Sequence, residues 1–542
     1  MIVLAGLVAG KTWGADVPSN STDPLLNLFI EKGYVTQDEA AKVKAEADQL
    51  RTNEVSNIPM PSSYWKMNSG VKNFELFGDV RMRYEDRAAT DPGANVIEQQ
   101  RLRYSLHFGV HANLADDFDF GFRLETAANP RSPWVTLGTS SSTSGPYQGP
   151  FGKSTDGVNV GQLYLGWQPE DWVHLEVGKL ANPLYTTPMV WDSDLNPEGA
   201  AEQFKYTVGE ADVFANMAQY LYADFNPNAA GAGLGFYGLT GPNSGQNTQN
   251  IFMFAWQGGV NYHIDQDMSA KIAATLYNYT GLERSSLNTS TSLSPYFGDP
   301  YVGEGAFFLA GGTAAGFAPG YAGYNPGAQF GQPGFSSSSY PFNQVGLNDL
   351  LIVEVPFEFN FKIEKKLAAR IFGDFAYNLD GAQRAEEAAS AYSTVLNTQI
   401  SSGTGTAIPH SFAAQTKDVK AYQIGFGFGS TNFVAGPSQG VVYGTSSSKH
   451  AWEFRTYFQH IEQYSLDPNL IDSDFFEGRE NVQGVYAAFA YSLSANVSGI
   501  LRYGYASRIN NLIGTGGSNQ DTPQMNPIAQ FQIIQFDLSY KF

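Results

Sequence analysis

The last twelve residues, FQIIQFDLSYKF, alternate strictly between two kinds of side chain. One face of this segment carries Ile534, Phe536, Leu538, Tyr540 and Phe542, and the other face is mainly polar. Since successive side chains of a strand point to opposite faces, the segment predicts a β-strand with one apolar side. Such a strand at the edge of a soluble sheet would invite aggregation, but it is stable where its apolar side meets lipid and its polar side lines a lumen. The chain end therefore predicts the closing strand of a transmembrane β-barrel.

The composition of the whole chain agrees with a barrel and excludes several other classes of protein. Aromatic residues make up 14% and charged residues only 15% of the chain, as expected of a barrel with aromatic girdles. No apolar run reaches the roughly 18 residues that a membrane-spanning helix needs. The absence of cysteine excludes disulfides, thiol catalysis and cysteine-bound metals. The net charge of −20 argues against nucleic acid as a partner, because phosphate binding requires clustered lysine and arginine.

Three regions are expected to follow one another along the chain. Residues 1–15 contain a short apolar run typical of a signal peptide. Residues 16–72 are expected to form a periplasmic helical segment and a linker, since Asp23 precedes Pro24 as a helix start. This segment either links the export signal to the barrel or is a short self-associating or cell-wall-contacting module. Residues 73–542 are expected to form the barrel itself.

Sixteen alternating segments are candidate strands. They begin near Phe74, Gln100, Phe118, Val158, Val173, Ala201, Ala211, Asn250, Ser269, Asp349, Ala368, Asp418, His450, Asn481, Val497 and Gln530. Short turns and long loops alternate between them, as expected when turns face the periplasm and loops face outside. The connection 431–448 is the exception, because it is long where a turn is due; it is either an extended turn or a hairpin that the pattern conceals. The sequence thus predicts an all-β, 16-stranded antiparallel barrel around an aqueous lumen.

The same alternation assigns a set of arginine side chains to the lumen. In each strand whose large apolar residues define the lipid-facing side, the arginines fall on the opposite side. The set comprises Arg81, Arg83, Arg103, Arg123, Arg370, Arg455 and Arg502. An arginine facing lipid near the midplane would cost about 2–4 kcal/mol, which favours this assignment. In a closed barrel, all of these except Arg370 and Arg455 would form one basic patch across the seam between the last and first strands.

Two interpretations of these arginines remain open, and both can hold at once. In the first, they pair with lumen acids such as Asp79, Glu125 and Glu453 and keep the interior hydrated. In the second, they face acidic residues across the lumen and create a transverse field that orients dipolar solutes. Catalysis has little support, because the histidines are scattered and a hydrolase would need a serine and a histidine side by side. We therefore expect no enzymatic activity, cofactor or metal site.

One segment with a distinctive sequence is VWDSDLNPEGAAEQFKY, residues 190–206, in the third long loop. It carries the acidic residues Asp192, Asp194, Glu198 and Glu202. Residues 73–542 resemble the bacterial outer-membrane general porins. The features that carry this resemblance are the loop, the strand pattern and the terminal phenylalanine. The resemblance is closest to the "putative porin" families that have a helical segment before the barrel. In general porins the third loop folds into the lumen, so the resemblance implies that the four acids form a constriction opposite the basic patch.

The resemblance also implies a function and partners. It implies a water-filled channel in the outer membrane, surrounded by lipid, through which small hydrophilic solutes and ions diffuse passively. It implies a homotrimer as well, since general porins usually pack three barrels together. Acidic mouths would make such a channel weakly selective for cations. The alternatives are a substrate-specific channel for sugars or anions, and a structural surface protein whose barrel anchors the loop 281–347.

Overall fold

A computed structural model describes residues 70–90, 96–127, 132–138, 157–223, 251–280, 302–310, 339–345, 350–386, 416–430, 449–474, 478–510 and 529–542. The expected signal peptide and periplasmic helices, and the ambiguous connection 431–448, lie outside these residues. Within the described ranges, no helix has the length and apolar character to cross a membrane.

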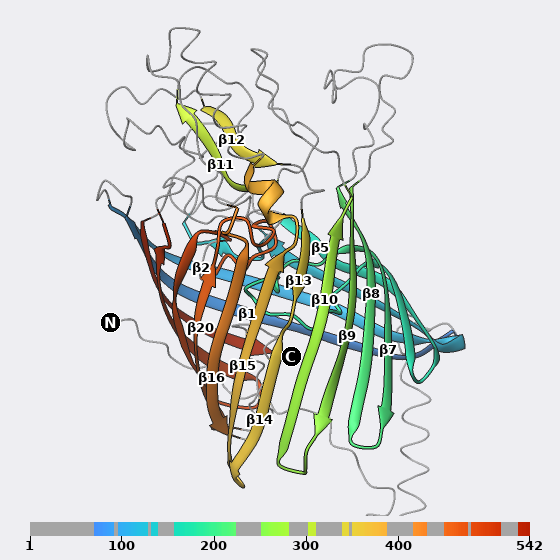
Figure 1. Ribbon diagram of the computed structural model, residues 1–542. Helices are drawn as coiled ribbons and strands as arrows, with labels where there is room; N and C mark the ends of the chain where they lie inside the picture. Colours follow the sequence, from blue (N-terminus) through green and yellow to red (C-terminus); the bar gives the residue numbers. More distant parts are fainter. Residues whose placement is uncertain are drawn as a thin grey trace, which may run out of the picture. The chain divides into compact units, whose positions relative to one another are not determined.

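The described part of the chain is almost entirely β-structure (Figure 1). The main sheet contains β1 (Val71–Thr90), β2 (Val96–Leu114), β3 (Phe118–Ala127), β4 (Val135–Thr136), β5 (Gly157–Glu170), β6 (Val173–Lys179), β7 (Glu198–Val208), β8 (Ala211–Ala223), β9 (Ile251–His263) and β10 (Met268–Tyr279). It continues with β13 (Leu351–Glu354), β14 (Phe357–Glu364), β15 (Leu367–Asn378), β16 (Lys420–Ser430), β17 (Trp452–Ile461), β18 (Val482–Ser492), β19 (Val497–Arg508) and β20 (Gln530–Lys541). Strands β11 (Val302–Ala310) and β12 (Ser339–Val345) form a separate pair.

These elements make a closed antiparallel barrel of sixteen strands in the described residues, which confirms the predicted count. β4 is a two-residue extension that pairs with β2 beyond the end of β3. β13 and β14 are one strand interrupted at Pro356, which has no backbone N–H to donate to a neighbouring strand. The first strand begins at Val71, two residues before the expected start of the barrel.

The barrel closes between its first and last strands. β20 pairs antiparallel with β1 from Asp79↔Lys541 to Thr90↔Gln530. Beyond that ladder, the backbone N–H and C=O of Phe542 exchange hydrogen bonds of 3.0 Å with those of Gly78. A Cβ at Gly78 would lie 2.6 Å from the Phe542 ring, so only glycine lets the terminal aromatic ring lie against the first strand.

Deleting Phe542 is expected to lower barrel insertion without altering any lumen residue. The deletion removes the backbone bonds to Gly78 and the ring that covers it, and both lie at the point of closure. The folded fraction can be measured by heat-dependent gel mobility of isolated outer membranes. Phe542→Leu is the matched control, because it keeps the backbone bonds and removes only the aromatic ring. If the truncated chain accumulates and conducts like the wild type, the terminal residue has no part in assembly.

Exposure of the side chains separates an outer from an inner surface along each strand. Large apolar side chains at alternate positions of the strands are exposed, for example Leu76, Met82, Leu501, Phe536 and Leu538. The side chains at the intervening positions are buried and largely polar. It includes Arg83, Glu85, Arg370, Arg455, Arg502, Gln535 and Asp537. An apolar exterior around a polar interior is the arrangement that a lipid-embedded barrel requires.

Candidate functional site

The β6–β7 loop, residues 180–197, lies inside the barrel and is fixed to the inner face of distant strands. Gln257 on β9 accepts a 2.9 Å hydrogen bond from the backbone N–H of Tyr185 and donates a 2.8 Å bond to its carbonyl. The next two side chains of the loop donate short bonds to carboxylates, Thr186 to Glu354 and Thr187 to Asp374 on β15. Because these contacts reach β9, β13 and β15, the loop crosses the lumen rather than lying along its rim.

A second inward segment, the β17–β18 loop within residues 462–481, was not foreseen from the sequence. Its Leu470 carbonyl accepts a 2.6 Å bond from the backbone N–H of Asp192, and the N–H of Asp472 donates to the Pro188 carbonyl at 3.1 Å. The backbone N–H of Ser473 donates to the Asp192 carboxylate at 3.3 Å. The two loops therefore dock on each other inside the barrel.

The docked loops enclose apolar side chains that pack against the inner wall. This cluster includes Leu180, Leu184, Met189, Val190 and Trp191 from the first loop, Leu466 and Ile471 from the second, and Tyr220, Tyr277 and Ile352 from the wall. The sequence feature that accompanies this burial is the group Leu466, Leu470 and Ile471 among the acids of the β17–β18 loop. The cluster fills part of the lumen and narrows the passage.

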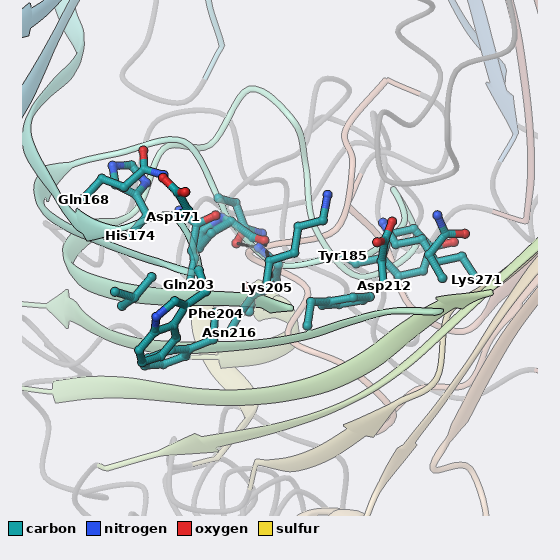
Figure 2. A pocket seen from close by; sticks show the side chains of 17 residues that line it. Gln168, Asp171, His174, Tyr185, Gln203, Phe204, Lys205, Asp212, Asn216 and Lys271 are labelled. Carbon is teal, nitrogen blue, oxygen red and sulfur yellow. Dashed lines mark hydrogen bonds between the residues drawn. The ribbon is translucent and has the colours of Figure 1, made fainter. Parts of the chain in front are cut away.

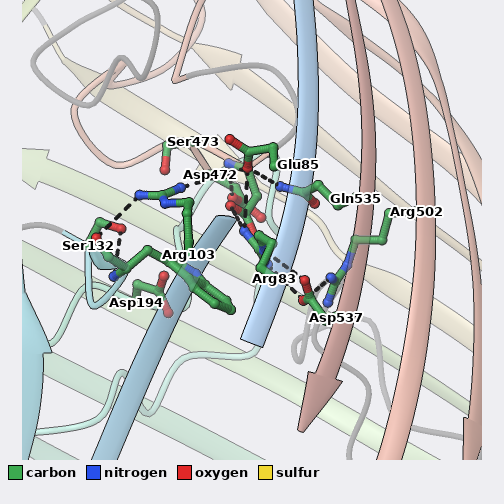
Figure 3. Close-up of polar contacts among 12 residues, drawn as sticks. Arg83, Glu85, Arg103, Ser132, Asp194, Asp472, Ser473, Arg502, Gln535 and Asp537 are labelled. Atoms are coloured by element: carbon green, nitrogen blue, oxygen red, sulfur yellow. Dashed lines mark hydrogen bonds and ion pairs between the residues drawn. The ribbon is translucent and has the colours of Figure 1, made fainter. Parts of the chain in front are cut away.

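On the β1 side of the lumen, the loop acids meet the predicted arginine wall (Figure 3). Arg83 donates from Nε and Nη2 to the two carboxylate oxygens of Asp537 at 2.7 and 2.9 Å. It also donates from Nη1 and Nη2 to Asp474 of the β17–β18 loop at 2.8 and 3.1 Å. Arg502 contacts the same Asp537 from the neighbouring strand β19. One fully buried guanidinium thus joins the closure seam to an inward loop.

Trp134 completes this part of the wall. Its ring is 1% exposed and lies 3.9 Å from the Arg83 guanidinium carbon and 4.9 Å from that of Arg81. Arg103 lies 5.9 Å from the same ring and donates to the Trp134 carbonyl at 3.4 Å. The faces of aromatic rings attract cations, so this side chain holds three arginines together. It falls just before β4, beyond the strand pattern that guided the prediction.

The loop acids differ in how readily they carry charge. Burial raises the pKa of the Asp194 carboxyl above its ordinary value, although nearby Arg81 acts in the opposite direction. Burial, and then the neighbouring Asp192 carboxylate, raise the pKa of Asp472. Burial also acts to raise the pKa of Asp474, but the facing Arg83 guanidinium holds that pKa below its ordinary value. Asp474 is therefore a fixed anion, whereas Asp194 can titrate.

The remaining predicted arginines pair with acids of the wall. Arg123 lies 2.9 Å from Glu125, and Arg81 lies 3.0 Å from Asp79. Arg370 and Arg455 share Glu453 at 3.7 and 3.0 Å. These contacts agree with the interpretation in which wall charges neutralise one another. Of the predicted set, Arg81, Arg83, Arg103 and Arg502 lie around the loop acids, while Arg123, Arg370 and Arg455 contact acids of the wall. The role of the set as a basic patch stays a prediction.

The predicted position of two acids was wrong. Glu198 and Glu202 belong to β7 and not to the inward loop. Glu198 is exposed and pairs with Lys179 at 3.1 Å. Glu202 pairs across the sheet with Leu175 and Met217, which places it on the outer face of the barrel. Of the four predicted acids, Asp192 and Asp194 lie in the lumen. The Asp192 carboxylate accepts the hydrogen bond from Ser473 that joins the two loops.

Histidine side chains on the inner face each contact a carboxylate. His107 lies 3.0 Å from Asp79, and His174 lies 2.9 Å from Asp119. Within the described ranges, no three His, Asp or Glu side chains are grouped as the ligands of a metal ion would be.

Comparison with known proteins gives one family and several structural neighbours. The model of the family described as "Putative porin" matches residues 86–542. No curated protein sequence matches the chain. One similar solved structure is OmpT of Vibrio cholerae, with 10% sequence identity and a TM-score of 0.36, and the match covers 89% of this chain and 100% of that one. A second is OpdQ of Pseudomonas aeruginosa, with 10% sequence identity and a TM-score of 0.36, and the match covers 88% of this chain and 99% of that one. A third is an anion-selective porin from Comamonas acidovorans, with 8% sequence identity and a TM-score of 0.37, and the match covers 87% of this chain and 99% of that one. These similarities are too low for what those proteins transport to be carried over to this chain.

Proposed function

This chain belongs to the family described as "Putative porin", and we propose that it lets small hydrophilic solutes and ions diffuse passively across the bacterial outer membrane. The observation that carries this proposal is the polar inner surface of the closed barrel, where buried arginines face carboxylates of an inward loop. Water-filled barrels of this size take their selectivity from the charges at their narrowest point. We propose that Arg81, Arg83 and Arg103 with Asp194 and Asp474 border that point, and that passage needs no chemical step and no cofactor.

Planar-bilayer recording of the purified protein tests the channel. We expect stepwise increases in current with an ohmic dependence on voltage, because diffusion through a water-filled lumen needs no activation. Protein unfolded by heat and added at the same concentration is the control. The two docked loops make a structural surface protein the natural alternative, and a barrel that inserts fully but shows no current would favour it.

The outer face of β7 supports the further proposal that the protein forms a homo-oligomer, with three subunits expected. Glu202 lies in the middle of its strand, four residues from Glu198 and four from Tyr206. Gln219 donates a 2.9 Å hydrogen bond to the Glu202 carboxylate, and the cross-strand neighbours of Glu202, Leu175 and Met217, are apolar. A carboxylate facing hydrocarbon at this depth costs free energy. Contact with a second copy of the chain would remove Glu202 from lipid.

Crowding that face is expected to break the oligomer. Met217→Trp adds a large ring beside Glu202 and is expected to lower the native mass in mild detergent to that of a monomer. Leu501→Trp on β19 is the matched control, because Leu501 is equally apolar and exposed on the outer face but lies on the opposite side of the barrel. A monomeric wild type, or equal effects of the two substitutions, would argue against an interface at β7 and β8.

A further inference from the structure

Below the β6–β7 loop, the inner wall contains a cavity of about 670 Å³ at the end of the barrel that carries the short turns (Figure 2). Its walls come from β5 to β10 and from the β5–β6 turn with Asp171 and Trp172, and residues 182–185 of the loop lie at its edge. The side chains that matter for its chemistry are Lys205, Phe214, Lys271, Asn216 and Tyr185. None of them belongs to the arginine and aspartate group beside Trp134.

The edge formed by the loop is held rigidly. Gln257 fixes both the N–H and the carbonyl of Tyr185, and Asn216 donates to the Pro183 carbonyl at 3.2 Å and to Gln257 at 2.9 Å. Phe214 meets Tyr185 edge-on, with ring centroids 6.4 Å apart. A Cβ at Gly259 would lie 2.3 Å from the Phe214 ring, so the missing side chain lets that ring lie against the wall. A site built this way needs little rearrangement to receive a ligand.

Two lysines point into this cavity, and no carboxylate neutralises either of them directly. The ammonium group of Lys271 lies 3.8 Å from the Tyr185 ring centroid and 5.2 Å from that of Phe214. Among the described residues, neither Lys271 nor Lys205 has a carboxylate within salt-bridge distance. The acid opposite Lys271 in the sheet, Glu358, lies 3.7 Å from Arg370 instead. The carboxylate of Asp212 already accepts bonds from Thr207 and His263.

The consequence for a ligand follows from charge and shape. The two ammonium groups repel each other across the cavity, and an anion between them would relieve that repulsion. The Phe214 ring and the apolar edge at Pro183 and Leu184 offer a surface to an apolar group beside the charge. A neutral or cationic solute would not reduce the repulsion between the two ammonium groups.

We propose that this cavity is a binding site in the lumen for small carboxylates with an apolar or aromatic body, with Lys205 and Lys271 holding the carboxylate and Phe214 contacting the body. The site deepens the proposed channel function, because it would retain such solutes on their way through the barrel. It is separate from the loop constriction, so binding and ion selectivity can be measured independently.

Isothermal titration of the full-length protein in detergent with benzoate tests the site. We expect benzoate to bind with one site per chain, and benzyl alcohol and benzylammonium to bind at least about tenfold more weakly, because charge-assisted hydrogen bonds are lost. Lys271→Gln and Lys205→Gln are each expected to weaken benzoate binding about tenfold. Lys271→Arg keeps the charge and should retain most of the affinity.

Lys72→Gln is the matched control for these variants, since it removes one exposed lysine from the same end of the barrel but at β1. It should leave benzoate affinity unchanged. Heat-dependent gel mobility establishes that each variant is folded before titration. Equal binding of benzoate and benzyl alcohol, or unchanged binding in both glutamine variants, would overturn the proposal. Benzoate binding without any conductance would leave this site standing and remove the channel function, so the two can fail separately.

Discussion

Replacing Arg83 by methionine is expected to destabilise the barrel by about 3–5 kcal/mol, the usual cost of removing one partner of a buried ion pair. The substitution leaves Asp474 without the guanidinium that donates to both of its oxygens. Asp537 keeps only Arg502, and Trp134 loses the cation nearest to its ring. Urea unfolding in detergent micelles, followed by tryptophan fluorescence, measures the loss.

The same substitution is expected to free the β17–β18 loop. The contact between Arg83 and Asp474 joins this loop to the β1 wall. Without it the loop should move, and the single-channel current should become larger and noisier. Adding Asp474→Asn to Arg83→Met should recover part of the lost stability, because it removes the buried charge left behind. Arg123→Met is the control, since the Arg123 side chain is 18% exposed, against 1% for Arg83, and pairs with Glu125 on its own strand β3. Equal losses for Arg83 and Arg123 would show that the buried cluster has no special role in the fold.

The strands could be predicted because two constraints act on every one of them. Alternation with a period of two divides the side chains, and the cost of a charge in lipid then decides which side is outside. Arg83, Arg370 and Arg502 were therefore assigned to the interior from sequence, and all three are buried there. The same pattern at the chain end predicted that the last strand closes on the first, and β20 pairs with β1.

The loops could not be predicted in the same way, because their positions depend on contacts between residues far apart in the chain. The Asp192 carboxylate accepts a hydrogen bond from Ser473, which lies 281 residues later in the sequence, and no local pattern indicates such a contact. The misplacement of Glu202 has a different cause. Residues 190–206 were assigned as a whole to the inward loop, although Glu202 lies on the same side of β7 as the exposed Tyr206 and Val208. The pairing of Glu202 with Leu175 and Met217 confirms that side as the outer one.

The second large effect is expected on ion selectivity, and it centres on Asp194. The wild-type channel should be weakly selective for cations, because acidic residues at the mouths and the narrow point raise the local cation concentration within a Debye length of roughly 8 Å. Asp194→Asn should move the reversal potential in a salt gradient toward anions, and Arg81→Gln should move it toward cations, because Arg81 is the arginine that acts most strongly on Asp194. Asp192 is unsuitable for this test, since its carboxylate holds the two loops together.

The pH dependence of the reversal potential separates Asp194 from Asp474. Because its pKa is raised, Asp194 gains a proton at a higher pH than an ordinary aspartate does. As the pH falls, cation selectivity should therefore begin to fall while Asp474 is still charged. Asp474 has a lowered pKa because of Arg83 and should stay charged throughout that range. Asp194→Asn should therefore reduce the early part of the pH response and leave the later part. A wild-type channel with strong anion selectivity would show instead that the arginines, and not the loop acids, control the field at the narrow point.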